Sequence, residues 1–203
     1  MPLGANKAAI MGVAGVSTAE IVLLYDTDHS GVSSAAITSG ITSTYGEYIF
    51  GFYNVNPATD GAHQFQFNVS VDGGSNYKTG TDETNFVTTH FNSYHDDGTS
   101  ASATALAYQT SYDRPNSKTD TILIPGIGNG ADEAGVGKLH LFNPASTTYV
   151  KHFIFRSQHH QYEDRSSSDF VAGYVNTTSA VNAIIFRMSS GNFDATIKMW
   201  GVK

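Results

Sequence analysis

Apolar and polar residues alternate one by one along several stretches of this chain. In "HQFQFNVSV" the apolar side chains at 65, 67, 69 and 71 fall on one side of an extended strand. Glutamine, asparagine and serine at the positions between them fall on the other side. A period of two predicts half-buried strands of an antiparallel sheet, with one apolar face and one polar face.

A second alternating stretch, "EYIFGFYNV", groups Tyr48, Phe50 and Phe52 on one face and ends before the turn-rich "NPATDGA". We expect these two stretches to form a hairpin with a long loop. The remaining candidate strands have short apolar or alternating patterns and cover residues 20–26, 85–94, 105–112, 121–124, 137–142, 148–156, 170–175, 181–188 and 196–200.

Loops rich in Gly, Asn, Asp and Ser separate the candidate strands, among them "HDDGTSASAT", "GIGNGADEAG" and "SQHHQYEDRSSSD". No stretch has a helical period, so about eleven short strands predict an all-β chain. We expect residues 20–203 to form a single antiparallel β-sandwich of jelly-roll type. The closing segment "SSGNFDATIKMWGVK" is expected to be a ladder strand, with Phe193, Ile197 and Met199 in the core.

Residues 1–19 differ from the rest because they are apolar and small and show no strand pattern. We interpret them as an extended N-terminal arm that is retained and packs either on its own domain or on a neighbouring subunit, and we favour the neighbouring subunit. The interface candidates are Leu3, Ile10, Met11 and Val13.

The composition excludes several classes of function. The chain has 203 residues and no cysteine, so disulfides, thiolate zinc sites and cysteine nucleophiles are ruled out. Lys and Arg total 11 against 18 Asp and Glu, and no two basic residues are adjacent. Nucleic-acid binding needs clustered cations, so we expect no nucleic-acid partner. No apolar run approaches the length of a membrane span, so we expect no membrane partner.

No motif indicates an enzyme. Gly126, Gly128 and Gly130 follow an apolar strand, but another strand comes next, whereas a dinucleotide loop requires a helix. There is no nucleophile elbow of the G-x-S-x-G type. We expect no catalytic residue, no cofactor and no metal, and we interpret most histidines as surface residues. Pairs of loop carboxylates, such as Asp132 with Glu133, leave a structural calcium open.

Exposed aromatic rings keep a second function class open. Tyr94, Tyr108, Tyr112, Tyr162 and Trp200 lie in or beside polar segments. Such rings can stack on sugars while neighbouring polar groups bind the hydroxyls, although aromatic residues also fill β cores. Carbohydrate binding is therefore the alternative function, with Tyr162 and Trp200 as the candidate glycan contacts.

Three stretches, "ITSGITSTYGEYIFGFYNVNPATD", "LHLFNPASTTYVKHF" and "SSGNFDATIKMWGVK", resemble small β-sandwich virion proteins of tailed bacteriophages, notably marine and cyanobacterial phages. Those proteins close with a segment like "SGNFDGTIKLYGI". The resemblance covers about half of the chain. Here Ala195 stands where glycine is usual and Trp200 where tyrosine is usual.

The resemblance implies a non-enzymatic structural protein located in the virion. It would be a capsid decoration, a knob or a tail- or fibre-associated subunit. Its expected partners are further copies of itself, in a trimer or higher ring, and other virion proteins. A host surface glycan is a further partner under the alternative function.

Overall fold

The computed structural model describes residues 20–77, 85–98 and 104–203, so the predicted arm with Leu3, Ile10, Met11 and Val13 lies outside the described residues. Its regular elements are strands, and every strand pair is antiparallel, which confirms the all-β prediction. Within these ranges, no helix has the length and apolar character needed to cross a membrane.

The strands are β1 (Ile21–Val32), β2 (Ala35–Ile37), β3 (Glu47–Pro57), β4 (Gln64–Ser70), β5 (Phe86–Asp96), β6 (Thr104–Tyr108), β7 (Pro115–Ser117), β8 (Thr121–Pro125), β9 (Gly135–Phe142), β10 (Lys151–Gln161), β11 (Arg165–Val175), β12 (Ala183–Met188) and β13 (Phe193–Val202).

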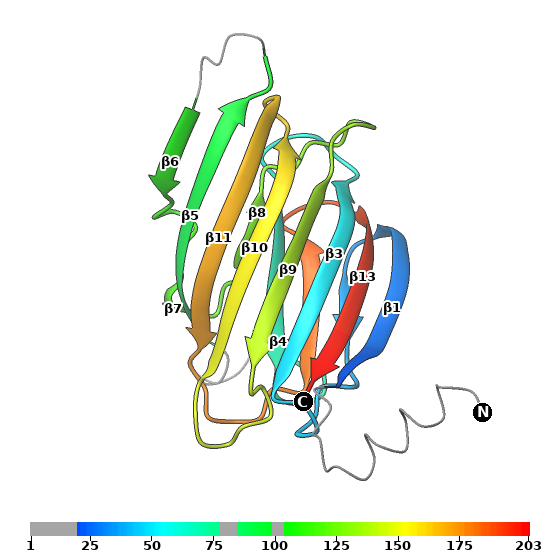
Figure 1. Cartoon of the computed structure of the whole chain (residues 1–203), viewed down its shortest axis with the longest axis vertical. Coiled ribbons are helices and arrows are strands. Elements are labelled where there is room, and N and C mark those ends of the chain that lie inside the picture. The colour runs from blue at the N-terminus through cyan, green and yellow to red at the C-terminus, as the bar shows by residue number, and fades with distance from the viewer. Residues whose placement is uncertain (1–19, 78–84, 99–103) are drawn as a thin grey trace, which may run out of the picture.

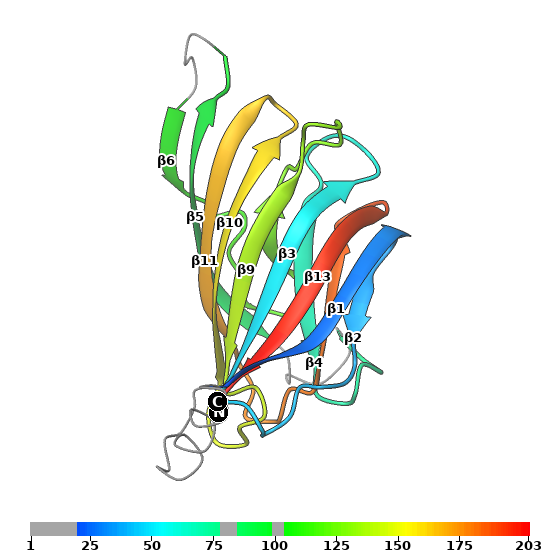
Figure 2. The same cartoon turned by 45° about the vertical axis from the view of Figure 1, so that its right-hand side comes forward.

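The strands form two sheets of unequal size. The larger sheet has nine strands in the order β1-β13-β3-β9-β10-β11-β5-β6, with β7 also paired to β5. The smaller sheet has the order β2-β12-β4-β8. The larger sheet lies in front in Figure 1, and its β5–β6 end extends beyond the smaller sheet. Figure 2 shows how its strands splay apart towards the top.

Aromatic side chains from both sheets meet in a shared core. The Phe52 ring of the larger sheet lies 4.8 Å from Phe186 and 5.3 Å from Phe65 of the smaller sheet, centroid to centroid. Phe67 and Phe153 make a similar contact at 5.1 Å. These edge-to-face contacts stabilise the packing beyond the burial of apolar area. The two sheets therefore form a sandwich-like pair, as the alternating stretches predicted.

The expected hairpin between the first two alternating stretches is wrong. β3 pairs with β13 and β9 in the larger sheet, whereas β4 pairs with β12 and β8 in the smaller one. Both strands have aromatic residues on one face, and each face is buried most fully when the strands lie on opposite sides of the core. The loop between them therefore crosses from one sheet to the other.

The polar face of β4 is also buried, which the alternating pattern did not predict. Asn68 is fully buried, and its Nδ2 donates to the Asp120 carboxylate at 2.8 Å. Arg187 on the neighbouring strand donates to the same carboxylate at 2.7 and 2.9 Å. The chain before β8 thus covers this face, and a polar network takes the place of solvent.

The stretch "SQHHQYEDRSSSD" was predicted as a loop, and this prediction is wrong. β10 continues to Gln161 and β11 begins at Arg165, so only a short turn separates them. Asp164 in this turn has φ 54°, a conformation that Asp tolerates better than most residues. The inward positions here are polar rather than apolar, which removed the hydrophobic signal of a strand.

The closing strand is confirmed. β13 lies between β1 and β3 within its own chain. Phe193, Ile197 and Met199 are all buried in the core. The C-terminal segment is therefore held by two ladders of backbone hydrogen bonds and by core packing.

Candidate functional site

The outer face of the larger sheet carries apolar side chains that the smaller sheet does not cover. Ile154 in β10 is 54% exposed and Leu23 in β1 is 49% exposed. Tyr53, Val136 and Phe91 add further exposed apolar surface from β3, β9 and β5. Scattered apolar residues are ordinary on protein surfaces, but several on one sheet face indicate an interaction surface.

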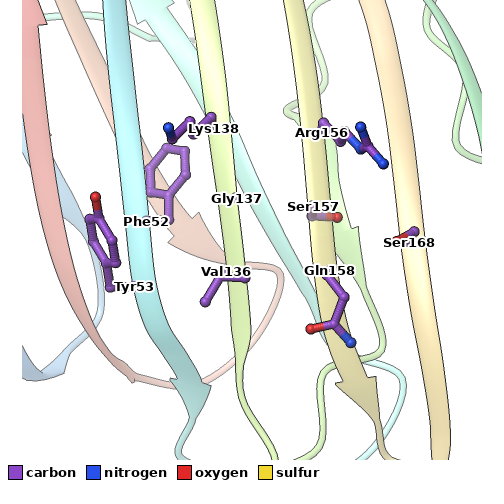
Figure 3. A pocket seen from close by; sticks show the side chains of 9 residues that line it. All are labelled: Phe52, Tyr53, Val136, Gly137, Lys138, Arg156, Ser157, Gln158 and Ser168. Atoms are coloured by element: carbon purple, nitrogen blue, oxygen red, sulfur yellow. The ribbon is translucent and has the colours of Figure 1, made fainter.

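A hollow of about 590 Å³ lies on this outer face, across β3, β9, β10 and β11 (Figure 3). Tyr53 and Val136 stand at one side, Gln158 and Ser168 at the other. Gly137 lies between them and contributes no side chain. The hollow is therefore shallow and mainly apolar, with polar groups at its β10–β11 side.

Two cations flank the hollow. Lys138 and Arg156 are register partners on β9 and β10, and both point outward. Figure 3 shows Lys138 directed towards β3 and Arg156 towards β11. Arg156 lies 4.8 Å over the Phe170 ring, and among the described residues neither cation has a carboxylate partner. Both cations are therefore available to carboxylates of a molecule bound at this face.

Trp200 also lies on the outer face, against the backbone of β3. Its register partners are Leu23 in β1 and Ile49 in β3. A Cβ built on Gly51 would come within 2.9 Å of the Trp200 ring, so the absence of a side chain there makes room for the indole. Packing on Gly51 therefore explains Trp200 as part of the sheet surface.

A second pocket, of about 180 Å³, lies at the end of the larger sheet where β10 turns into β11. We call it the tyrosine pocket, because Tyr94, Tyr112 and Tyr162 line it. Asn92, Gln109 and Gln161 add side-chain amides. The pocket thus combines aromatic surface with groups that donate and accept hydrogen bonds.

The structure separates the two predicted glycan contacts. Tyr162 lines the tyrosine pocket, whereas Trp200 lies on the outer face. Trp200, Ile49, His140 and Ile154 follow one another across the sheet register, and Tyr162, the first residue after β10, comes eight residues beyond Ile154. Eight residues of strand span roughly 26 Å. One saccharide ring cannot contact both residues.

An arginine and two carboxylates border the tyrosine pocket. Arg165 Nε donates to Asp96 at 3.1 Å, and its Nη1 pairs with Glu163. The guanidinium also lies 5.1 Å over the Tyr94 ring. Hydrogen bonding to Asp96 raises the pKa of Arg165. The positive charge is thus already matched by its neighbours.

Burial and nearby carboxylates raise the pKa of two of the tyrosines in this pocket. Burial, followed by the charge of Asp169, raises the pKa of Tyr112. Burial and the adjacent Glu163 likewise raise the pKa of Tyr162. Both phenols therefore stay protonated at neutral pH and remain hydrogen-bond donors.

A buried cluster lies behind the tyrosine pocket. Asp169 in β11 sits between His90 in β5 and His159 in β10, with distances of 2.9 Å to His90 Nε2 and 3.3 Å to His159 Nδ1. Ser157 Oγ donates to the same carboxylate at 3.1 Å. All three charged or titratable residues are fully buried, so the expectation that most histidines are surface residues fails for this pair.

The charge of Asp169 is stabilised by its partners. Burial acts to raise the pKa of Asp169, but the imidazoles of His159 and His90 outweigh it and lower the pKa. Tyr112 packs against the His90 ring at 5.1 Å, centroid to centroid. The cluster therefore forms the inner support of the pocket. Sequence reasoning missed it, because residues 79 positions apart meet only through the sheet.

Of the loop carboxylates considered for calcium, Glu133 has partners within the protein itself. It accepts a hydrogen bond from the Gly130 backbone N–H at 2.6 Å, and its other oxygen lies 3.5 Å from His160 Nδ1. The described part of the chain contains no group of three side chains arranged to hold a metal ion. Comparison with protein-family models, curated proteins and solved structures finds no match.

Proposed function

We propose that this chain is a non-enzymatic structural protein of a tailed-bacteriophage virion, which forms a homo-oligomer and docks on the capsid or tail. The observation that carries the proposal is the placement of the three stretches that resemble phage virion proteins. Residues 37–60 contain β3, residues 139–153 contain the end of β9 and the start of β10, and residues 189–203 contain β13. These four strands are neighbours, in the order β13-β3-β9-β10, so the resemblance concerns one continuous piece of the sheet.

The strand order supports a jelly-roll assignment. Without β5–β7 and β10–β11, eight strands remain, four in each sheet. Of these, the first pairs with the last, the second with the next to last and so inward: β1–β13, β2–β12, β3–β9 and β4–β8. A long hairpin rolled into two sheets pairs in this way. Viral capsid and lectin domains both use jelly rolls, so the assignment agrees with a virion role without requiring it.

The outer face of the larger sheet offers a surface for a second copy of the chain. Its exposed apolar residues supply area for burial, with Ile154 near the centre. Lys138 and Arg156 supply two cations without a carboxylate partner among the described residues. The chain carries a formal net charge of −7, so another copy brings carboxylates in excess. Apolar burial and charge complementarity then act together.

Native mass spectrometry of the full-length protein, beside a variant lacking residues 1–18, tests the assembly role. A discrete trimer or larger ring is expected for the full-length protein. If the arm with Leu3, Ile10, Met11 and Val13 is the assembly element, the truncated protein stays folded but fails to form that ring. If both proteins are monomers over the micromolar range, self-assembly is excluded.

Mass spectrometry of purified phage particles that encode this chain tests the virion location. The protein is expected in the particle at a copy number that is a multiple of its ring size. Its presence in infected cells but not in particles would contradict the proposal.

A further inference from the structure

We infer that the tyrosine pocket is a binding site for a neutral saccharide, with room for one sugar ring. This activity goes beyond the structural role and does not depend on it. Its basis is the meeting of aromatic rings and side-chain amides at one end of the larger sheet. Tyr162 is the only one of the two predicted glycan contacts that takes part, because Trp200 lies on the outer face.

The side-chain amides of Gln109 and Asn92 are oriented by a hydrogen bond to each other, which uses one polar atom of each. Gln109 Nε2 donates to Asn92 Oδ1 at 2.8 Å. This leaves Asn92 Nδ2 as a donor and Gln109 Oε1 as an acceptor, and no side-chain partner for either lies within the described ranges. Asn92 is only 3% exposed and lines the pocket, so this donor is held in the pocket wall, where a ligand or water can accept from it. Two adjacent hydroxyls of a sugar match this pair of groups, because one hydroxyl can accept from Asn92 Nδ2 while the other donates to Gln109 Oε1.

The tyrosines and a proline provide the apolar part of the site. Tyr94, Tyr112 and Tyr162 approach from β5, from the β6–β7 connection and from the β10–β11 turn, and Pro125 closes the wall at the end of β8. Sugar rings carry C–H faces that pack on such aromatic surface while their hydroxyls are bound at the rim. The lining therefore suits a ligand with both apolar and hydroxylated surface.

The charges favour a neutral ligand over an acidic one. Arg165, the cation that lines the pocket, already pairs with Asp96 and Glu163. Two carboxylates against one guanidinium leave an excess negative charge at this rim. An acidic sugar would meet repulsion and no available cation among these residues, so sialylated or sulfated glycans are disfavoured.

The walls are held in place before any ligand binds. Tyr162 lies against Gly126, where an added Cβ would be 3.3 Å from the ring, and the Tyr162 backbone N–H donates to the Gly126 carbonyl at 3.1 Å. Gly126 has φ 65°, which favours glycine. Tyr112 rests on His90, which Asp169 fixes from behind. A preformed wall lowers the entropy cost of binding a small ligand.

An array of neutral and acidic oligosaccharides, followed by NMR titration with the methyl pyranoside of the best ligand, tests the inference. Neutral glycans are expected to bind, with chemical-shift changes at Tyr162, Gln109 and Asn92. The variants Y162A and Q109A are expected to lose at least tenfold in affinity. Tyr149→Ala is the matched control, because Tyr149 is 74% exposed and lies in the turn at the opposite end of β10.

Three outcomes overturn the inference: no neutral saccharide binds at millimolar concentration, only acidic glycans bind, or affinity is unchanged in both pocket variants. Circular dichroism and thermal melting show whether Y162A is folded, and Q109A provides a second variant at a more conservative position. Native mass spectrometry of Y162A is expected to match the unsubstituted protein, so a failure of saccharide binding is separable from a failure of assembly.

Discussion

Asp169 carries a carboxylate that is fully buried between His90 and His159, so the stability of the fold should depend strongly on this residue. Asp169→Asn removes the charge that both imidazoles contact. Removing one partner so that a buried hydrogen-bonding group is left unsatisfied costs about 1–3 kcal/mol, and more when a charged group is involved. We expect a loss of this order in the free energy of unfolding, measured by urea denaturation. Asp132→Asn, in an exposed loop, is expected to leave the midpoint unchanged.

The same carboxylate predicts a pH dependence. Its pKa is lowered in the folded protein from an ordinary value of 3.8. Its contribution to stability is therefore complete above about pH 4 and is lost as the pH falls through the lower folded value. The urea midpoint of the unsubstituted protein should drop over this acid range, while the Asp169→Asn variant lacks that component. Parallel curves for the two proteins would contradict the assignment.

His160, near the end of β10, has a pKa shift that gives a pH dependence of the opposite sign. Its hydrogen bond with Asp97, opposed by burial and helped by Glu133, raises its pKa above 6.5. The stabilisation is complete below pH 6.5 and is lost as the pH rises through the folded value. NMR titration of the imidazole should give a midpoint above 6.5. Asp97→Asn should bring it back towards 6.5, and an unchanged midpoint would show that Asp97 is not the cause.

At the scale of elements, the junction between β5 and β11 depends on a glycine. A Cβ on Gly173 would lie 2.3 Å from the Val87 carbonyl oxygen and 2.9 Å from Thr88 Cα. Both are backbone atoms of the neighbouring strand, so Gly173→Ala forces the strands apart. We expect a loss of about 2 kcal/mol, the cost of forced overpacking. Amide exchange in β5 should accelerate more than exchange in β13.

The control for this substitution is Thr89→Ala, on the exposed face of β5. Its backbone pairing with β11 is unaffected, so stability should change little. Equal losses in Gly173→Ala and Thr89→Ala would indicate a general sensitivity of β5 rather than a close approach at Gly173.

The pair of β9 and β10 is predicted to gain stability from a charge reversal. Lys138→Glu places a carboxylate opposite Arg156 in the register, in place of a second cation whose side chain points away from Arg156. Opposite charges across strands contribute up to about 1 kcal/mol relative to a neutral pair. Urea denaturation should show a stabilised monomer. Lys198→Glu is the contrasting variant, because it breaks the pair with Asp26 and should lower stability.

At the scale of the whole molecule, a substitution on the outer face can change assembly without changing folding. Ile154 is 54% exposed, so Ile154→Asp adds a charge to the surface without disturbing the core. We expect the variant to fold with an unchanged thermal midpoint and to be a monomer by native mass spectrometry. An oligomer identical to that of the unsubstituted protein would exclude this part of the face as the interface. Tyr149→Ser, in the β9–β10 loop, is the control that should leave the oligomer intact.

The sequence by itself determined the strands whose buried faces are apolar. Tyr48, Phe50 and Phe52, and likewise Phe193, Ile197 and Met199, form strands and are buried where the alternation placed them. Such strands are readable because the period of two and the burial of apolar area carry the same information. The all-β class followed for the same reason.

Strands with polar inward faces gave no such signal. The end of β10 and the start of β11 direct His159, Ser167 and Asp169 inward, so the segment had the composition of a loop. The partners that make these residues strand-forming lie on β5, far away in the sequence. Local pattern therefore could not predict this hairpin.

Only the tertiary structure decided which side chains meet. Tyr94, Tyr112 and Tyr162 were equivalent in the sequence to other aromatic residues beside polar segments, and the fold brings these three to one pocket. It places Trp200 instead on Gly51 at the outer face. A strand pattern specifies which face a residue occupies, whereas the order of strands in a sheet sets its neighbours, and that order depends on the packing of the whole chain.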